Sequence, residues 1–255
     1  MLIDTHSHIY LPEFDEDRID VVARAKAAGV TQIVLPNVDR DTLEPMLALE
    51  ATDPAYFHAA IGLHPTSVTA DFKQELAWVK QELKRRPYCA IGEVGVDLYW
   101  DKTFRNEQIA VFEQQLQWAI DYQVPVIIHQ REAFSETIAC MEKFNCKQLQ
   151  GIFHSFGGTI EEAQRILALG GFLLGINGVV TFKNTQLRSV LTHLSPEDLV
   201  LETDAPYLTP VPYRGKRNES AYVQLIAQKL GEIFHLPVER IAETTGRNAM
   251  ELFHL

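Results

Sequence analysis

The feature that most constrains the fold is a repeated alternation of short apolar runs with longer amphipathic segments. The short runs are rich in Val and Ile and are expected to form strands over Leu2–Ser7, Gln32–Asn37, Phe57–His64, Cys89–Val96, Pro125–Gln130, Gly151–Ser155, Gly171–Ile176 and Leu199–Thr203. Segments with helical spacing lie between them or follow the last one, for example Arg18–Ala28, Leu76–Arg85, Arg105–Tyr122, Ile160–Leu169, Thr185–Leu194, Glu219–Phe234 and Val238–Leu252. Strands that alternate with helices indicate a parallel sheet with crossover helices.

Eight strand–helix units in 255 residues match the size of a (β/α)8 barrel. We therefore predict an α/β fold, a single-domain TIM-type (β/α)8 barrel, regular or distorted, over residues 1–255. A doubly wound open sheet is the alternative. No linker or low-complexity segment divides the chain.

Composition narrows the class of protein. The formal net charge of −11 disfavours a protein that coats long nucleic acids, because such binding depends on cationic groups that neutralise phosphate. It leaves open a smaller phosphate-bearing substrate drawn to bound metal ions. Cys89, Cys140 and Cys146 are too few for a disulfide scaffold, and neither a signal-peptide pattern nor a membrane-spanning apolar run is found. We expect a cytoplasmic enzyme with no membrane association and no obligate protein partner.

Ionisable side chains stand at the carboxyl ends of the predicted strands, where barrel enzymes build their active sites. The opening segment LIDTHSH has Asp4, His6 and His8 on alternate positions, and alternate side chains share one face of a strand. The other groups are His64 in IGLHP, Glu93 and Asp97 in AIGEVGVD, His129 and Arg131 in PVIIHQR, His154 in GIFHSFGG, and Glu202 and Asp204 in LVLETDAP.

Barrel closure would gather these groups, because the last strand pairs with the first and the fifth adjoins the sixth. We predict two divalent metal ions. The first is held by His6, His8 and Asp204, from strands one and eight, and the second by His129 and His154, from strands five and six. Glu93 is shared between the two ions. Imidazole and carboxylate ligands suit Zn, Mn, Fe or Ni, and Mg is less natural at so many histidines.

Each residue alone has a simpler interpretation. A single buried histidine such as His64 is more often hydrogen-bonded than metal-bound. Asp97 is expected to cap the next helix or to accept loop hydrogen bonds, and Arg131 to pair with a neighbouring carboxylate. Six candidate ligands on five strands are harder to explain in this way, because buried charge is costly unless it is paired or metal-bound.

The same segments resemble the TatD-like metal-dependent hydrolases of the amidohydrolase superfamily. The matching segments follow the family's order across essentially the whole chain, and they are IDTHSH, GLHP, AIGEVGVDLYW, PVIIHQR, FHSFGG, LVLETDAPYL and YRGKRNES. The His-x-His opening is widespread in the superfamily, whereas GEVGVD and LETDAP together are specific. The resemblance implies a TIM-type barrel, the six metal ligands above, and a deoxyribonuclease that acts from the 3′ end of single-stranded DNA. Tyr10 and Ser135 depart from the family pattern, and we expect them to bear on substrate preference more than on chemistry.

We therefore predict a phosphodiesterase in which a metal-bridging hydroxide attacks phosphorus. Asp204 is expected to take the proton of the water, His64 to contact a phosphoryl oxygen or protonate the leaving group, and Glu202 to orient a ligand. The candidate phosphate contacts are Arg131, Arg214, Lys216 and Asn218. For the last three a solvated basic loop is the alternative, and the segment from Gly178 to Phe182 either stacks on a base or is simply a packed loop.

Two other functions stay open. A hydrolase of an amide, a lactone or an aminoacyl ester would use the same two-metal site. Glu93 favours the phosphodiesterase, because many superfamily amidases bridge their metals with a carboxylated lysine instead. A non-catalytic binding protein is the third possibility, and the complete ligand set argues against it.

Overall fold

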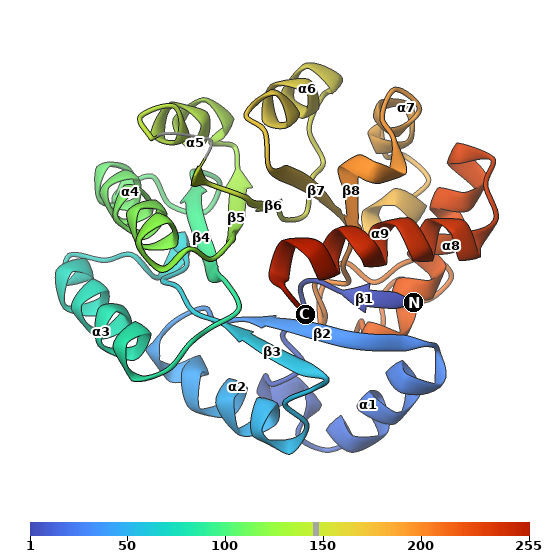
Figure 1. The fold of residues 1–255 in the computed structure, drawn as a ribbon, viewed down its shortest axis with the longest axis horizontal. Helices are drawn as coiled ribbons and strands as arrows, with labels where there is room; N and C mark the ends of the chain where they lie inside the picture. The colour runs from blue at the N-terminus through green and yellow to red at the C-terminus, as the bar shows by residue number, and fades with distance from the viewer. Residues whose placement is uncertain (145–147) are drawn as a thin grey trace.

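The computed structural model describes residues 1–144 and 148–255, so Cys146 lies outside the described part. Within those residues eight parallel strands follow one another in chain order and alternate with helices around a ring (Figure 1). The strands are β1 (Leu2–Asp4), β2 (Val30–Pro36), β3 (Phe57–Ala60), β4 (Ile91–Asp97), β5 (Val126–Arg131), β6 (Gly151–Phe153), β7 (Phe172–Ile176) and β8 (Leu199–Leu201). The helices are α1 (Arg18–Ala27), α2 (Arg40–Thr52), α3 (Phe72–Arg85), α4 (Arg105–Tyr122), α5 (Phe134–Met141), α6 (Ile160–Ala168), α7 (Leu187–Leu191), α8 (Val223–Phe234) and α9 (Val238–Phe253).

Two seams join the strands into one ring. The strands pair as β1–β2–β3 and as β4–β5–β6–β7–β8. At the seam between β8 and β1, the His8 backbone N–H donates to the Ala205 carbonyl at 2.8 Å. At the seam between β3 and β4, the Ile61 carbonyl accepts from the Gly92 N–H at 2.9 Å. The TIM-type barrel is therefore confirmed, and strand order in chain sequence excludes the doubly wound sheet.

Four strands end two or more residues earlier than the sequence predicted. Regular pairing stops at Asp4 in β1, Ala60 in β3, Phe153 in β6 and Leu201 in β8. Beyond β6 and β8 the backbone leaves the extended conformation, because Ser155 and Asp204 adopt positive φ angles of 51° and 58°. The candidate ligands after these four strands therefore lie just past the strand ends. The barrel is distorted there.

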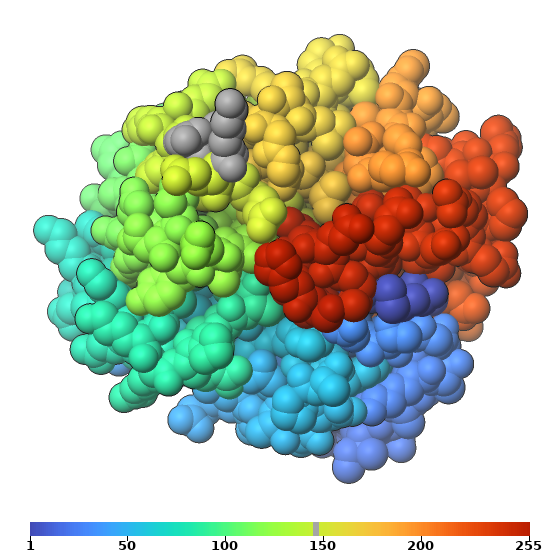
Figure 2. Space-filling view, in the orientation of Figure 1, coloured from blue at the N-terminus to red at the C-terminus, as the bar shows by residue number. Residues whose placement is uncertain are grey.

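The interior of the barrel is filled by side chains from the strands and closed by α9. Buried side chains from the strands meet three from α9, and together they are Ile3, Val34, Ala60, Ile127, Ile152, Val200, Ala249, Leu252 and Phe253. Figure 1 shows α9 crossing this end of the ring, and Figure 2 shows it covering the middle of the same face. Because α9 occupies this end, a site can open only at the carboxyl ends of the strands.

Local signals set several helix boundaries. α6 begins with a capping box in which Thr159 and Glu162 exchange side-chain to backbone hydrogen bonds. α2 begins in the same way at Asp39 and Thr42. No helix among the described residues has the length and hydropathy needed to cross a membrane.

Candidate active site

A cleft of about 690 Å³ opens at the carboxyl ends of the strands. Its lining includes residues that belong to or follow all eight strands, and the ionisable ones come from six of them. The ionisable members are His8, His64, Glu93, Asp97, His129, Arg131, His154 and Asp204. His6 is wholly buried beneath them. The cleft therefore collects nearly all the groups that the sequence placed at strand ends.

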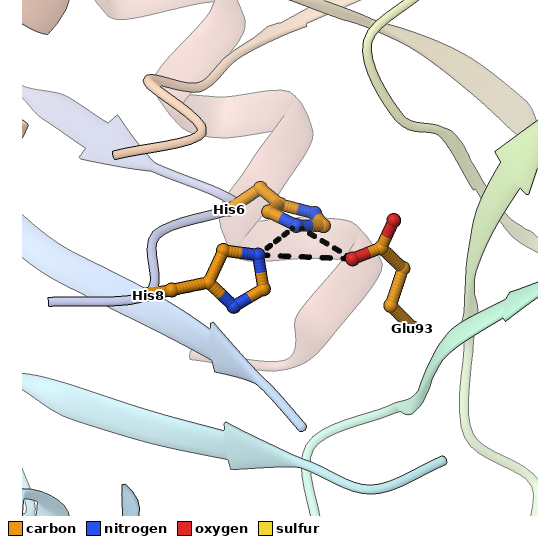
Figure 3. A group of neighbouring side chains, drawn as sticks. All are labelled: His6, His8 and Glu93. Carbon is orange, nitrogen blue, oxygen red and sulfur yellow. Dashed lines mark hydrogen bonds and ion pairs between the residues drawn. The ribbon is translucent and has the colours of Figure 1, made fainter. Parts of the chain in front are cut away.

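The first donor group is built from residues that follow β1 and β8 and from one residue of β4. His6 Nε2 and His8 Nε2 lie 3.0 Å apart. Glu93 Oε2 lies 3.2 Å from the first nitrogen and 3.7 Å from the second (Figure 3). Asp204 Oδ1 lies 3.8 Å and 3.7 Å from the same two nitrogens. Four donor atoms thus converge as the sequence predicted for the first metal ion.

The second donor group uses the other oxygen of Glu93. Glu93 Oε1 lies 2.8 Å from His129 Nδ1 and 3.3 Å from His64 Nε2, and these two nitrogens are 3.3 Å apart. From the sequence, His154 is expected to share a metal ion with His129, and His64 to contact the substrate. In the structure His64 also faces Glu93, so both histidines must be considered for this position. Glu93 reaches both groups, as a shared ligand must.

His154 lies between the two donor groups. Its ring stacks on that of His6 with centroids 3.5 Å apart, whereas the His129 ring is 6.5 Å away. His154 Nε2 lies 3.8 Å from Glu93 Oε1 and 3.9 Å from Asp204 Oδ1. The structure therefore brings all six predicted ligands together.

Gly95 explains how β4 presents two carboxylates to one histidine. It pairs with His129 of β5 and has a φ of 150°, and a Cβ there would lie 1.9 Å from the His129 carbonyl oxygen. Only glycine permits this approach. Glu93 and Asp97 lie on either side of it on the same strand face, and each has an oxygen 2.8 Å from a ring nitrogen of His129.

Asp97 has two kinds of partner. Its Oδ1 accepts hydrogen bonds from the backbone N–H groups of Tyr99 and Trp100, which agrees with the loop role expected for it. Its Oδ2 contacts His129, a contact the sequence analysis missed although the alternation Glu93, Gly95, Asp97 indicated a shared face. Burial alone would lower the pKa of His129, but Asp97 and then Glu93 raise it.

Glu202 contacts the Nδ1 side of the His154 ring. It is wholly buried, its Oε1 lies 3.0 Å from His154 Nδ1, and the same oxygen accepts a hydrogen bond from the Ser155 N–H at 2.6 Å. Burial would lower the pKa of His154, but Glu202 and Asp204 raise it to about 10. Glu202 thus contacts the predicted ligand His154, and its role in orienting that ring stays a prediction.

The charges of the first donor group suit a cation. Burial would raise the pKa of Glu93, but the surrounding imidazoles, first of all His64, hold it well below its ordinary value. Burial lowers the pKa of His6 strongly and that of His8 to about 4, so both rings are neutral. Burial also raises the pKa of Asp204 to about 7. Neutral imidazoles beside an ionised carboxylate are donors that a divalent ion can use.

Unpartnered atoms in the same region agree with this reading. His6 Nδ1 and Glu202 Oε2 are buried and have no hydrogen-bond partner within residues 1–144 and 148–255. Buried polar atoms are normally paired, and an unpaired one often marks a place for an ion or a water molecule. The residues present therefore fit bound metal ions.

The predicted phosphate contacts are not all at the cleft. Arg131 lines it, and its guanidinium lies 3.8 Å from the centre of the Tyr99 ring; no carboxylate of the described chain is within ion-pair distance. Arg214 and Lys216 are exposed and do not belong to the described lining of the cleft. Arg214 instead lies 3.6 Å from the centre of the Phe182 ring.

Asn218 has a structural position instead. It is wholly buried, and its side-chain amide donates to the carbonyls of Thr203 and Tyr207 at 2.8 Å and 2.6 Å. It holds the loop after β8 and has no amide hydrogen left for a phosphate. The segment from Gly178 to Phe182 is closely packed at Gly178, where a Cβ would lie 2.0 Å from the Leu208 carbonyl oxygen, whereas Val179 lines the cleft.

The two departures from the family pattern lie in different places. Ser135 is exposed on α5, outside the described lining of the cleft. Tyr10 is buried, and its hydroxyl oxygen lies 2.8 Å from His8 Nδ1 and 2.5 Å from the Pro36 carbonyl oxygen. Tyr10 therefore contacts a candidate ligand, and its effect on substrate preference stays a prediction.

A parallel barrel whose strand ends bring histidines and carboxylates to one cleft has the fold and donor set of a metal-dependent hydrolase. The family model described as TatD related DNase matches residues 3–254, and the chain belongs to this family.

Individual relatives agree. The chain is 37% identical to the metal-dependent hydrolase YabD of Bacillus subtilis (strain 168), with all of both chains covered. It is 30% identical to a Pantoea protein named 3'-5' ssDNA/RNA exonuclease TatD, again with both chains covered in full. The crystal structure of YjjV, a TatD homologue from Escherichia coli K12, has a TM-score of 0.91, 30% identity and coverage of 100% of this chain and 98% of that one.

Proposed function

We propose that the protein is a phosphodiesterase that removes nucleotides from the 3′ end of single-stranded DNA. The observation that carries the proposal is Glu93, whose two carboxylate oxygens each reach a separate group of histidines. A carboxylate that reaches both groups can hold two metal ions close together, and two-metal phosphoryl transfer uses such a pair. The exonuclease name of the Pantoea relative supports the choice of substrate.

The metal ions would be held by residues already described. His6, His8 and Asp204 would hold one ion and His129 and His154 the other, with Glu93 shared. When bound, such ions activate a water molecule as nucleophile and stabilise charge on the attacking and leaving oxygens.

Asp204 is the proposed general base. It faces the cleft, and its Oδ1 lies 3.8 Å from His6 Nε2 and 3.7 Å from His8 Nε2, beside the first donor group. A carboxylate in this position can accept the proton of the attacking water and later return it. Its positive φ of 58° directs the chain away from β8 at this residue.

His64 is the proposed hydrogen-bond donor to the phosphate. The Thr66 backbone N–H donates to His64 Nδ1 at 3.2 Å, so this nitrogen carries no hydrogen. Burial lowers the pKa of His64, so the ring is neutral and its hydrogen is on Nε2. Nε2 lies 3.3 Å from Glu93 Oε1 in the cleft lining, and in the proposed role it donates to a phosphoryl oxygen or to the leaving oxygen. This tautomer favours the donor role over metal ligation through Nε2.

Arg131 is the remaining phosphate contact that we propose. It lies at the rim of the cleft, and its cation is without a carboxylate partner among the described residues. A guanidinium there can bind the phosphate next to the one being cleaved.

The test is digestion of a 5′-labelled single-stranded oligonucleotide by metal-stripped protein, with and without added Mg²⁺ or Mn²⁺. We expect a metal-dependent ladder that shortens from the 3′ end. Metal-loaded protein that leaves DNA intact but cleaves an amide, a lactone or an aminoacyl ester would overturn the proposal in favour of the carbonyl hydrolase.

A further inference from the structure

The rim of the cleft carries exposed aromatic side chains. Trp100 is 68% exposed, Tyr207 52% and Tyr99 48%, and Trp100 and Tyr207 line the cleft. Single exposed aromatics are common on proteins, but exposed aromatics that gather in one place mark contact sites. Tyr99 and Trp100 are in ring contact, and Trp100 and Tyr207 line the same cleft as the candidate metal centre.

Trp100 is held in position rather than free. Its backbone N–H and that of Tyr99 both donate to Asp97 Oδ1, at 3.2 Å and 2.9 Å. The Tyr99 and Trp100 rings meet edge to face, with centroids 4.9 Å apart. The Arg131 guanidinium lies 3.8 Å from the Tyr99 ring centre and 5.2 Å from that of Trp100. One anchored cluster thus offers an aromatic face and a cation side by side.

We propose that this cluster binds one nucleotide of a single strand, with its base stacked on Trp100 and its phosphate on Arg131. Every base has a π-face, so stacking on an aromatic side chain is tolerant of sequence, and the cation next to it matches the sugar–phosphate backbone. The inference rests on the proposed function and adds to it that the enzyme requires bases, not only phosphodiesters.

The experiment compares a labelled oligothymidine with an oligonucleotide of the same length that has abasic sites, in both cleavage and equilibrium binding by fluorescence anisotropy. Trp100→Ala is expected to weaken binding of oligothymidine at least about tenfold and to leave binding of the abasic strand within about twofold. Tyr122→Ala is the matched control, because Tyr122 is an exposed aromatic of α4 that is not part of the cleft lining in the described chain.

Equal weakening for both strands, or none for oligothymidine, would overturn the stacking proposal. The binding arm does not need catalysis, so it is separate from the proposed function. Wild-type protein that binds oligothymidine through Trp100 but cleaves neither strand would refute the proposed exonuclease and keep the stacking site.

The partners of the Tyr10 hydroxyl fix the direction of its hydrogen bond with His8. The Tyr10 hydroxyl has one hydrogen and two close partners, His8 Nδ1 at 2.8 Å and the Pro36 carbonyl oxygen at 2.5 Å. A carbonyl can only accept, so the hydroxyl donates to Pro36 and its oxygen accepts from His8 Nδ1–H. In a neutral ring the other nitrogen, Nε2, then has a free lone pair. This nitrogen faces Glu93.

We infer that Tyr10 is a positioning residue that fixes His8 in the tautomer a metal ion requires. The partner on the far nitrogen of a ligating histidine sets its tautomer and ring orientation. His64 shows the opposite arrangement, since Thr66 donates to its Nδ1 and leaves the hydrogen on Nε2. Two histidines face Glu93, and their neighbouring hydrogen bonds give them different roles. His8 is left with a lone pair for a metal ion, and His64 is left with a hydrogen that it can donate.

The test uses Tyr10→Phe, which keeps the ring and removes the hydroxyl. Zn²⁺ affinity measured by chelator competition is expected to fall about 10- to 100-fold. Tyr56→Phe is the matched control, because Tyr56 is also buried and its hydroxyl has no hydrogen-bond partner within the described residues. Long-range ¹⁵N–¹H spectra of metal-free wild-type protein should show His8 with its hydrogen on Nδ1. A hydrogen on Nε2, or unchanged Zn²⁺ affinity in Tyr10→Phe, would overturn the assignment.

Discussion

Glu202→Gln tests the buried pair beneath the candidate metal centre. Glu202 is wholly buried and its Oε1 lies 3.0 Å from His154 Nδ1. Glutamine keeps the shape of the side chain and an oxygen that can accept from Ser155 N–H, but it removes the negative charge. The substitution therefore leaves the protonated His154 ring without its nearest counter-charge.

The cost can be worked out in two ways. Removing one partner of a buried ion pair costs about 3–5 kcal/mol. The pKa of His154 rises from 6.5 to about 10 on folding, which corresponds to about 5 kcal/mol at about 1.4 kcal/mol per pH unit. Because the folded pKa is raised, this stabilisation is fully present below pH 6.5 and is lost as the pH rises through about 10. Part of the second figure belongs to Asp204, so the loss in the variant is expected near 3 kcal/mol.

The assay is urea unfolding of metal-free protein at neutral pH and above about pH 10. Glu251→Gln, on the exposed side of α9, is the matched control. We expect Glu202→Gln to be about 3 kcal/mol less stable than wild type at neutral pH, with a smaller difference at the higher pH. A variant as stable as wild type at neutral pH, or a difference that does not change with pH, would refute the assigned pair.

Other substitutions separate chemistry from stability. Asp204→Asn is expected to lower turnover on single-stranded DNA by about 10²–10⁴-fold while part of the bound metal is retained, and near-normal turnover in single-turnover assays would contradict its role as base. Phe253→Ala is expected to destabilise the fold by about 3–5 kcal/mol, because Phe253 is 3% exposed and fills the closed end of the barrel. Thermal melting measures this loss, and metal content should stay at the wild-type level; an unchanged melting temperature would contradict the assigned packing.

The fold was predictable because each strand and helix carries its own signal. Helix α4 has the predicted bounds, Arg105–Tyr122, and its buried positions recur at helical spacing from Gln108 to Ala119. The strand ends were not predictable to the residue. Apolar runs continue past β3 into Ile61 and Leu63, but regular pairing ends at Ala60. Pairing depends on the neighbouring strand, which the run itself does not describe.

The candidate site was likewise predictable only in part. Barrel closure placed Asp204 near His6 and His8, because strand order alone requires it. The position of His154 depends on ring orientation, and its stacking on His6 has no signal in the spacing of residues.

The residues that contact the candidate metal ligands could not be predicted from the sequence either. Tyr10 reaches His8 only because the chain after β1 brings its hydroxyl to Nδ1 at the edge of the ring. Asn218 illustrates the reverse error, since its place in a basic loop indicated a phosphate contact and the folded loop uses its amide for two carbonyls.

The most direct test of the account is the metal content of wild-type protein and of Glu93→Gln after equilibrium dialysis against Mn²⁺ or Zn²⁺. If Glu93 joins both donor groups, wild type binds two ions per chain and Glu93→Gln weakens both sites together. One ion in wild-type protein, or a variant that loses one ion and binds the other with unchanged affinity, would contradict the shared carboxylate.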